Sequence, residues 1–208
     1  MKIYDITATI GENLPAYSGH ERSSITQILD MRKGDVCNLS TFAASMHTGT
    51  HADMPLHFIA DGASCEDAAL ENFYGTAKLF RLNVTSHVTA ADLQPLDIGA
   101  GDIVLLDTGQ SPNMRVPQMN KDYLALTPDA AQYLAEKKIR TLGIDYLSID
   151  PADTTDFAVH KIILGNGIAV LEGLVLDGVP EGTYTLSALP LKLQNGNGSP
   201  VRAVLIAP

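Results

Sequence analysis

The sequence predicts one α/β domain over residues 1–208, with a large mixed, partly antiparallel sheet. Short apolar segments rich in β-branched residues recur along the chain, each bounded by Gly, Pro, Asn or Asp, a pattern typical of strands. Helical segments are fewer and are interspersed with these strands, which favours helices packed against a sheet. A chain of 208 residues is long enough for one substantial core.

The strand-like segments are distributed over the whole chain. They are Ile3–Ile10, Ser24–Leu29, Val36–Ala44, Ala77–Val84, Ile103–Thr108, Arg140–Ile144, Ile168–Leu171, Gly182–Leu186 and Val201–Ile206.

Three segments are predicted as helices, namely Thr89–Leu93, Thr127–Lys138 and Asp156–Leu164. The second has the strongest pattern, because Thr127 stands at the cap position and Pro128 in the first turn. The same segment ends in Lys137 and Lys138, whose positive charges interact favourably with the negative end of the helix dipole. The third is expected to stop at the glycines that follow Leu164.

The composition excludes several classes of partner. The formal net charge is −10 and no cluster of Lys or Arg is present, which argues against nucleic acids and membrane surfaces. No apolar stretch approaches 18 residues, and the first residues do not resemble a signal peptide. Two cysteines make no disulfide framework. We therefore expect a cytoplasmic protein that acts on a small molecule.

Three histidines and an aspartate lie within eleven residues, at His47, His51, Asp53 and His57. Imidazole and carboxylate groups together suit zinc or manganese. Thr-Gly-Thr between the first two histidines makes a poor helix, so a turn at Gly49 is expected to bring them together. If the chain is locally extended, His51 and Asp53, two residues apart, lie on the same side of it. The segment lacks the His-Glu-x-x-His pattern of helical zinc proteases.

Three ligands leave a cation with open positions, as a catalytic metal requires. A bound cation lowers the pKa of water to roughly 7, and a nearby histidine can then act as a base. His57 is the candidate base. The alternative is that His57 is a further metal ligand.

Two later residues are also candidates. Glu172 interrupts an apolar segment that otherwise resembles a buried strand, and a buried carboxylate is costly unless it is paired or binds a metal. His160 lies shortly before the Asn166–Gly167 turn and could face the same cavity. From the residues alone, it is equally open that His160 is a surface histidine and that Glu172 is held in a salt bridge.

The segment His47-Thr-Gly-Thr-His51-Ala-Asp53-Met-Pro-Leu-His57-Phe resembles the signature of the putative cyclase family, which includes bacterial kynurenine formamidases and isatin hydrolases. Further matches cover nearly the whole chain. They are KIYDIT, LPAYSGH, GDIVLLDTG, GIDYLSIDP, HKIILGNG, AVLEGL and ALPLKL followed by GSPVRAVLI.

The resemblance implies a swivelling β/β/α-type fold and a homodimer or higher homo-oligomer with one or two Zn²⁺ ions, or Mn²⁺, per subunit. His47, His51 and Asp53 would bind the first ion. Asp53 would bridge to a second ion completed by His160 and Glu172, and His57 would transfer protons. The implied activity is hydrolysis of a small amide by cation-activated water, with N-formylkynurenine as one candidate substrate.

The family's formamidases carry Trp in an N-terminal P-x-W-P-G-D stretch that contacts the aromatic substrate. Here Tyr17, Ser18 and His20 replace the Trp, Pro and Asp of that stretch. Tyr17 could still stack on a flat ligand and is the candidate substrate-binding residue. Three alternatives therefore stay open, namely an isatin-type cyclic amide hydrolase, a metal-dependent lyase, dehydratase or cyclase, and a metal-binding protein without catalysis.

Overall fold

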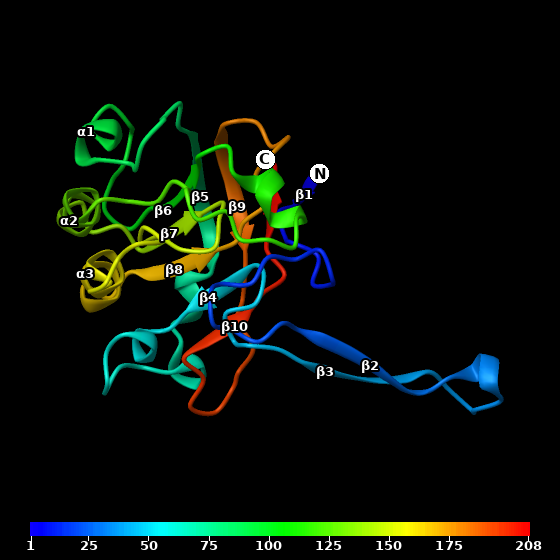
Figure 1. Ribbon diagram of the computed structural model, residues 1–208. Helices are drawn as coiled ribbons and strands as arrows, with labels where there is room; N and C mark the ends of the chain where they lie inside the picture. Colours follow the sequence, from blue (N-terminus) through cyan, green and yellow to red (C-terminus); the bar gives the residue numbers. More distant parts are fainter.

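A nine-stranded mixed sheet, three α-helices on one side of it and a projecting hairpin make up the computed structural model, which describes residues 1–208 (Figure 1). The strands are β1 (Ile3–Asp5), β2 (Ser24–Leu29), β3 (Leu39–Ala43), β4 (His51–Asp53), β5 (Tyr74–Arg81), β6 (Ile103–Asp107), β7 (Thr141–Ile144), β8 (Ala169–Glu172), β9 (Gly182–Ser187), β10 (Gly198–Pro200) and β11 (Val204–Ile206). The α-helices are α1 (Ala90–Leu93), α2 (Pro128–Glu136) and α3 (Ala158–Gly165), and short 3-10 helices cover Met31–Lys33, Pro55–His57, Cys65–Asp67, Leu70–Asn72 and Ser111–Arg115.

The large sheet has the strand order β1-β11-β9-β5-β6-β7-β8-β4-β10. Strands β5, β6, β7 and β8 run parallel, while every pairing outside this block is antiparallel. Parallel neighbours require crossover connections, and α2 and α3 supply those from β6 to β7 and from β7 to β8. The alternation of strands and helices predicted from the sequence thus produces the mixed α/β sheet.

The core lies on both faces of the parallel block. On one face, Leu106 and its neighbours pack against Leu134 of α2 and Ile163 of α3. On the other face, Leu105 and Leu171 join a second buried cluster. Burial on both faces explains why the first four residues of β6, Ile103–Leu106, are all apolar. In Figure 1 the three helices form a column to the left of the sheet.

The predicted helices are confirmed, with modest shifts at their ends. Thr127 is the N-cap residue of α2, although its hydroxyl donates to the carbonyl of Val88 at 2.9 Å and accepts no hydrogen bond from the helix N–H groups. The third helix begins two residues later than expected, at Ala158. The longest of the three, α2, has nine residues, and none of the helices has the length and apolar character needed to span a bilayer.

The strand predictions fail where the strands are very short. The expected strand Ile3–Ile10 is only Ile3–Asp5, because pairing with β11 ends there. Strands β4 and β10 were not predicted, since three residues of mixed polarity carry no periodic signal. Met54 is extended, with φ −101° and ψ 155°, as is usual for a residue that precedes proline.

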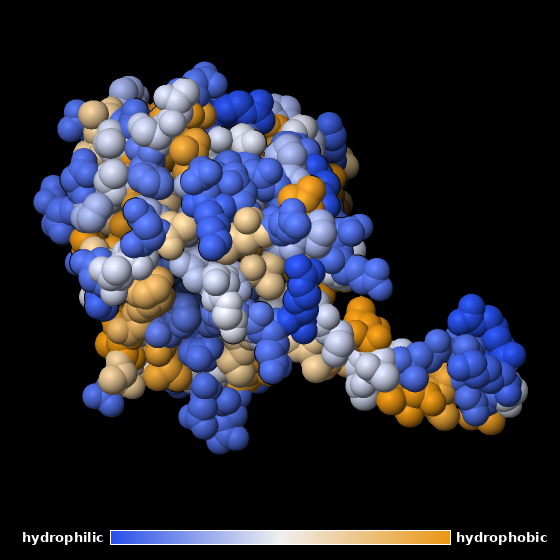
Figure 2. All heavy atoms as spheres, in the orientation of Figure 1, coloured by the Kyte–Doolittle hydropathy of each residue, from blue (hydrophilic) through white to orange (hydrophobic).

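Strands β2 and β3 form a separate two-stranded sheet that projects from the body as an arm, residues 24–43 (Figure 1). Large apolar side chains on it are exposed, including Ile25 at 65% and Phe42 at 53%. Figure 2 shows apolar surface along the lower edge of this arm. These exposed side chains have no packing partner within the chain. A two-stranded hairpin without such a partner is only marginally stable in water.

Candidate metal centre

The pairing of β4 with β8 assembles the first part of the site. His51 lies directly opposite Glu172 in the antiparallel register, and Asp53 follows two residues along the same strand. Side chains two residues apart on a strand point to the same face, so both residues of β4 can approach Glu172. The predicted bend at Gly49, with φ +67°, places His47 beside them.

Glycine contacts hold this arrangement closely. Gly173 has φ +67°, and a Cβ added there would overlap the backbone of Gly49. The Thr50 hydroxyl accepts from the N–H of Ala8 at 2.8 Å and donates to the carbonyl of Gly173 at 2.5 Å. The loop that carries His47 is therefore tied to the residue after Glu172.

Five predicted ligand residues converge in two groups that share Asp53. The first group is His47, His51 and Asp53, and the second is Asp53, His160 and Glu172; within each group the potential ligand atoms lie within 4.8 Å of one another. Asp53 Oδ1 is 3.3 Å from His51 Nε2, while Asp53 Oδ2 is 3.3 Å from His160 Nε2. The carboxylate thus presents a different oxygen to each group.

The spacing of these atoms fits a divalent cation. Ligand atoms on a zinc ion lie about 3.0–3.5 Å apart, because each bond is about 2.0–2.2 Å long. Glu172 has one oxygen 3.4 Å from His51 Nε2 and the other 3.2 Å from His160 Nε2. His47 Nδ1 is closer, at 2.7 Å from Asp53 Oδ1, and this hydrogen bond would give way to a cation.

Burial and unpaired polar atoms support the same interpretation. His51, Asp53, His160 and Glu172 are each at most 4% exposed. His51 Nε2, Asp53 Oδ2 and His160 Nε2 have no hydrogen-bond partner in the protein. A buried polar atom without a partner costs about 1–3 kcal/mol, so three such atoms at one place indicate a ligand.

In each of the rings of His47, His51 and His160, the nitrogen that points away from the ligand groups (the outward nitrogen) contacts a protein oxygen. His47 Nε2 contacts Asn197 Oδ1 at 3.1 Å, His51 Nδ1 contacts the carbonyl of Gly49 at 2.9 Å, and His160 Nδ1 contacts Asp150 Oδ2 at 2.6 Å. These oxygens only accept, so the outward nitrogens carry hydrogen. The inward nitrogens are then the ones available to a cation.

The buried charges make the centre attractive to cations. Burial alone would raise the pKa of Asp53, but its contacts with His160, His47 and His51 outweigh burial and hold the pKa well below its usual range. Burial would lower the pKa of His51, yet Asp53 and Glu172 raise it to about 10. The carboxylates therefore keep protons on the rings, and a divalent cation would displace them.

His57 lies beside the two groups and belongs to neither. Its ring stacks on that of His47, with centroids 3.8 Å apart and an interplanar angle of 23°. Burial lowers the pKa of His57 to about 4, so its imidazole is neutral at pH 7. A neutral imidazole beside a cation site can accept a proton.

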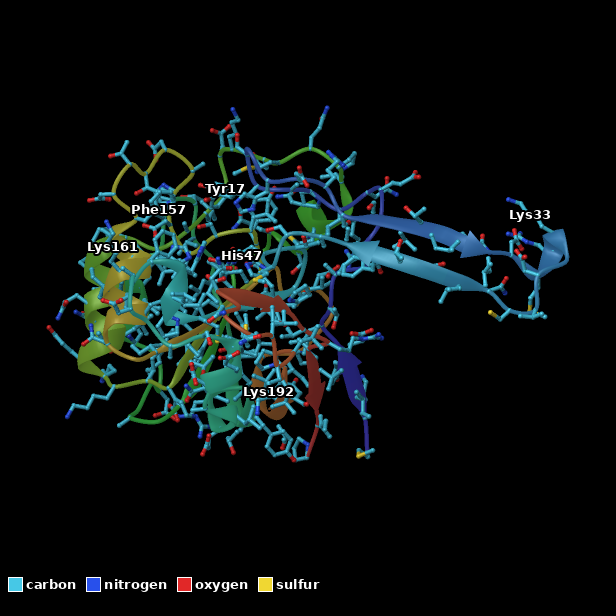
Figure 3. The ribbon with its side chains drawn as sticks, turned by 90° about the horizontal axis from the view of Figure 1, so that it is seen from below. Tyr17, Lys33, His47, Phe157, Lys161 and Lys192 are labelled. Carbon is cyan, nitrogen blue, oxygen red and sulfur yellow. The ribbon has the colours of Figure 1, made fainter.

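A cavity of about 230 Å³ opens onto the centre and is bordered by His47, His51, His160 and Glu172. Aromatic side chains line the rest of it, and they include Tyr17, His57, Phe58 and Phe157. Tyr17 and Phe157 lie near His47 in Figure 3, far from Lys33 at the tip of the arm. All seven predicted site residues thus border the cavity or belong to the two groups beneath it.

Several residues at the site were not predicted from the sequence, among them Phe58, Phe157 and Asp150. Phe58 follows His57 directly and could have been found as part of the same segment. Phe157 stands at the N-cap of α3 with φ 50°, a left-handed conformation with no sequence signal in a phenylalanine. Asp150 lies ten residues from the histidine it contacts, and only the fold brings them together.

The chain is similar to known proteins over most of its length. Residues 4–151 match the family model described as "putative cyclase". The chain is 35% identical over 209 aligned residues to a kynurenine formamidase of Salinibacter ruber (strain DSM 13855 / M31), covering 99% of this chain and 97% of the relative.

Solved structures also align with this chain over nearly its full length. One described as a potential metal-dependent hydrolase with cyclase activity has a TM-score of 0.87 and 36% identity, covering 98% of this chain and 96% of the other. An isatin hydrolase bound to a product analogue has a TM-score of 0.88 at 23% identity, covering 100% and 92%, which shows the shared fold.

We predict that Asp53→Ala abolishes binding of zinc or manganese, because it removes an oxygen from both groups. Metal content after loading and desalting, measured by mass spectrometry, is expected to fall close to zero. His20→Ala is the matched control, since His20 lines the same cavity but belongs to neither group. Undiminished metal content in Asp53→Ala would show that Asp53 is not a ligand.

Proposed function

The chain belongs to the putative cyclase family, and on that premise we propose that it hydrolyses the C–N bond of a small aryl amide at a centre for two divalent cations. Metal-dependent amide hydrolysis is the activity that its full-length relatives and its buried ligand groups indicate together. The proposal concerns the number of ions, the role of each residue and the substrate class.

The bridging position of Asp53 carries this proposal. One oxygen faces His47 and His51 and the other faces His160, so a single carboxylate can serve two ions. Glu172 and His160 would complete the second site. Imidazole and carboxylate ligands accept zinc and manganese alike. Bound there, a divalent cation lowers the pKa of water and polarises a carbonyl oxygen.

His57 would supply the proton transfers. Its stacked position on His47 and its low pKa leave a neutral nitrogen beside the ligand groups. We propose that His57 takes a proton from the attacking water and returns it to the leaving amine, since amines leave poorly unless protonated.

Aromatic groups around the cavity support an aryl substrate. Tyr17, Phe58 and Phe157 offer ring faces or edges, and flat ligands gain from offset or edge-to-face contact with such rings. N-formylkynurenine is one member of this class, and the Salinibacter ruber relative is described as a kynurenine formamidase. Tyr17 would contact the ring while the amide carbonyl faces Glu172 and the histidines.

The proposed activity can be tested on protein loaded with zinc or manganese. We expect release of the amine product from N-formylkynurenine or ring opening of isatin, and either reaction can be monitored by absorbance. Simple lactones serve as further test substrates. Asp53→Ala protein prepared in parallel is the control for contaminating hydrolases. Dehydration of a hydroxy acid without any amide hydrolysis would favour a lyase using the same centre.

For His57→Ala we predict a kcat lower by about 10²–10⁴-fold, the usual contribution of a positioned acid or base. Metal content should equal that of the unmodified protein, because His57 belongs to neither ligand group. The variant is compared by metal analysis and steady-state kinetics. A kcat within a few-fold of the unmodified protein would assign the proton transfer to another group.

We also propose that the protein is a cytoplasmic homodimer in which each arm packs on the second copy. The arm exposes Ile25, Ile28, Leu39 and Phe42 on a hairpin with no packing partner of its own. Exposed apolar surface of this kind marks an interaction site. The thiols of Cys37 and Cys65 are unpaired, which suits a reducing compartment.

The arm proposal predicts that Ile25→Lys with Phe42→Asp dissociates the dimer. These residues pair across the hairpin, so opposite charges preserve the hairpin while removing its apolar surface. The control is Thr26→Lys with Thr41→Asp, the next pair, which points to the opposite face. Light scattering after gel filtration measures the mass, and monomeric unmodified protein at micromolar concentration would refute the homodimer.

A further inference from the structure

Asp150 is buried next to the ligand groups, although it is not one of them. Its side chain is 1% exposed and lies in the segment between β7 and α3. Asp150 Oδ1 accepts from the N–H of Val159 at 3.1 Å, and Oδ2 accepts from the N–H of His160 at 2.9 Å and from its ring Nδ1 at 2.6 Å. One carboxylate therefore holds both the backbone and the ring of His160.

The backbone of Asp150 is held in turn by its neighbours. Its N–H donates to Ser148 Oγ at 3.1 Å, and its carbonyl accepts from the Tyr123 hydroxyl at 2.6 Å. These bonds are buried, so little freedom remains for the carboxylate to turn away.

The start of α3 depends on this contact. Phe157, at the N-cap position, makes no side-chain cap and has a left-handed backbone. The first N–H groups of a helix have no partner within the helix and need an external acceptor. Asp150 supplies it from seven residues before Phe157, a cap that local sequence does not reveal.

The same contact sets the direction of the His160 ring. An ionised carboxylate only accepts, so Nδ1 of His160 must donate to it. Nε2 is then left facing Asp53 and Glu172 at 3.3 and 3.2 Å. Phe58 packs against the ring, with centroids 4.5 Å apart, which limits its rotation.

We propose that Asp150 is a positioning residue that holds the His160 imidazole with Nε2 open toward the second cation, and that it links the start of α3 to the metal centre. This inference rests on the proposed two-cation centre. Hydrogen bonds to the outer nitrogen of a metal-binding histidine typically change metal affinity by 10–100-fold.

The test compares Asp150→Asn with Asp145→Asn by calorimetric titration of Zn²⁺ into metal-free protein. Asp145 is an equally buried carboxylate that accepts from the N–H groups of Thr108 and Gln110, and it contacts no candidate ligand. Both variants lose an acceptor inside the protein, so both should unfold at lower temperature.

Only Asp150→Asn is expected to weaken zinc binding, by about 10–100-fold at the ion held by His160. An amide can donate to Nδ1, which would place hydrogen on Nε2 instead. Nitrogen-15 NMR of the zinc-loaded proteins should therefore show His160 protonated at Nδ1 in unmodified and Asp145→Asn protein, and a reduced Nδ1–H signal in Asp150→Asn.

Equal zinc affinity in the two variants, or an unchanged His160 signal in Asp150→Asn, overturns the proposed role and leaves Asp150 a structural cap. The two-cation centre is tested separately by the titration of the unmodified protein, which is expected to bind two ions. A single ion there would contradict the proposed function, while the difference between the variants still decides the role of Asp150.

Discussion

The antiparallel pairing of β4 with β8 places opposing charges in the interior and determines the rest of the site. Because His51 stands opposite Glu172 in this register, a shift of β4 by one residue would turn His51 to the face of the sheet opposite Glu172. Strand β10 pairs with the other edge of β4, and Gly198 opposite Asp53 leaves space for the ring of His47. A strand of only three residues is thus fixed from both sides, by a parallel block on one and a short antiparallel strand on the other.

Burying Asp53 and Glu172 together carries a free-energy cost that hydrophobic packing alone does not offset. An isolated ionised carboxylate is very unfavourable in a nonpolar interior unless it is paired. In the protein His51 and His160 supply that pairing, and the raised pKa values of these two rings reflect it. The same electrostatic arrangement favours a cation, because the rings can exchange protons for metal without moving far. Stability and metal affinity therefore draw on the same buried charges.

The local part of the site could be predicted from residue types and spacing, whereas the contacts of Asp53 with His160 and Glu172 were implied only by the family resemblance. The bend at Gly49 follows from residue types and is present, whereas the short strand β4 has no sequence signal of its own. Glu172 stood out as a charged residue in an apolar segment. Its pairing with His51 of β4 depends on the strand register, which the periodicity of the sequence does not encode. The arm was predicted as two strands and not as a projection, because its alternation is the same as that of a strand within a sheet. The cap that Asp150 gives to α3 spans a loop, so it leaves no pattern at the helix start.

The contact between Gly173 and Gly49 also bears on how an ion could leave. The Gly49 carbonyl that orients His51 lies against Gly173, the residue following Glu172, so the backbone beneath these two ligands is closely packed. Release to solvent would then proceed through the cavity that borders four of the ligands, past Tyr17 and His57. A ligand lodged in that cavity would obstruct the exit as well as occupy the site. Substrate occupancy would therefore slow the exchange of the bound ions. A chelator would then remove the ions more slowly from the substrate-saturated enzyme than from the substrate-free enzyme.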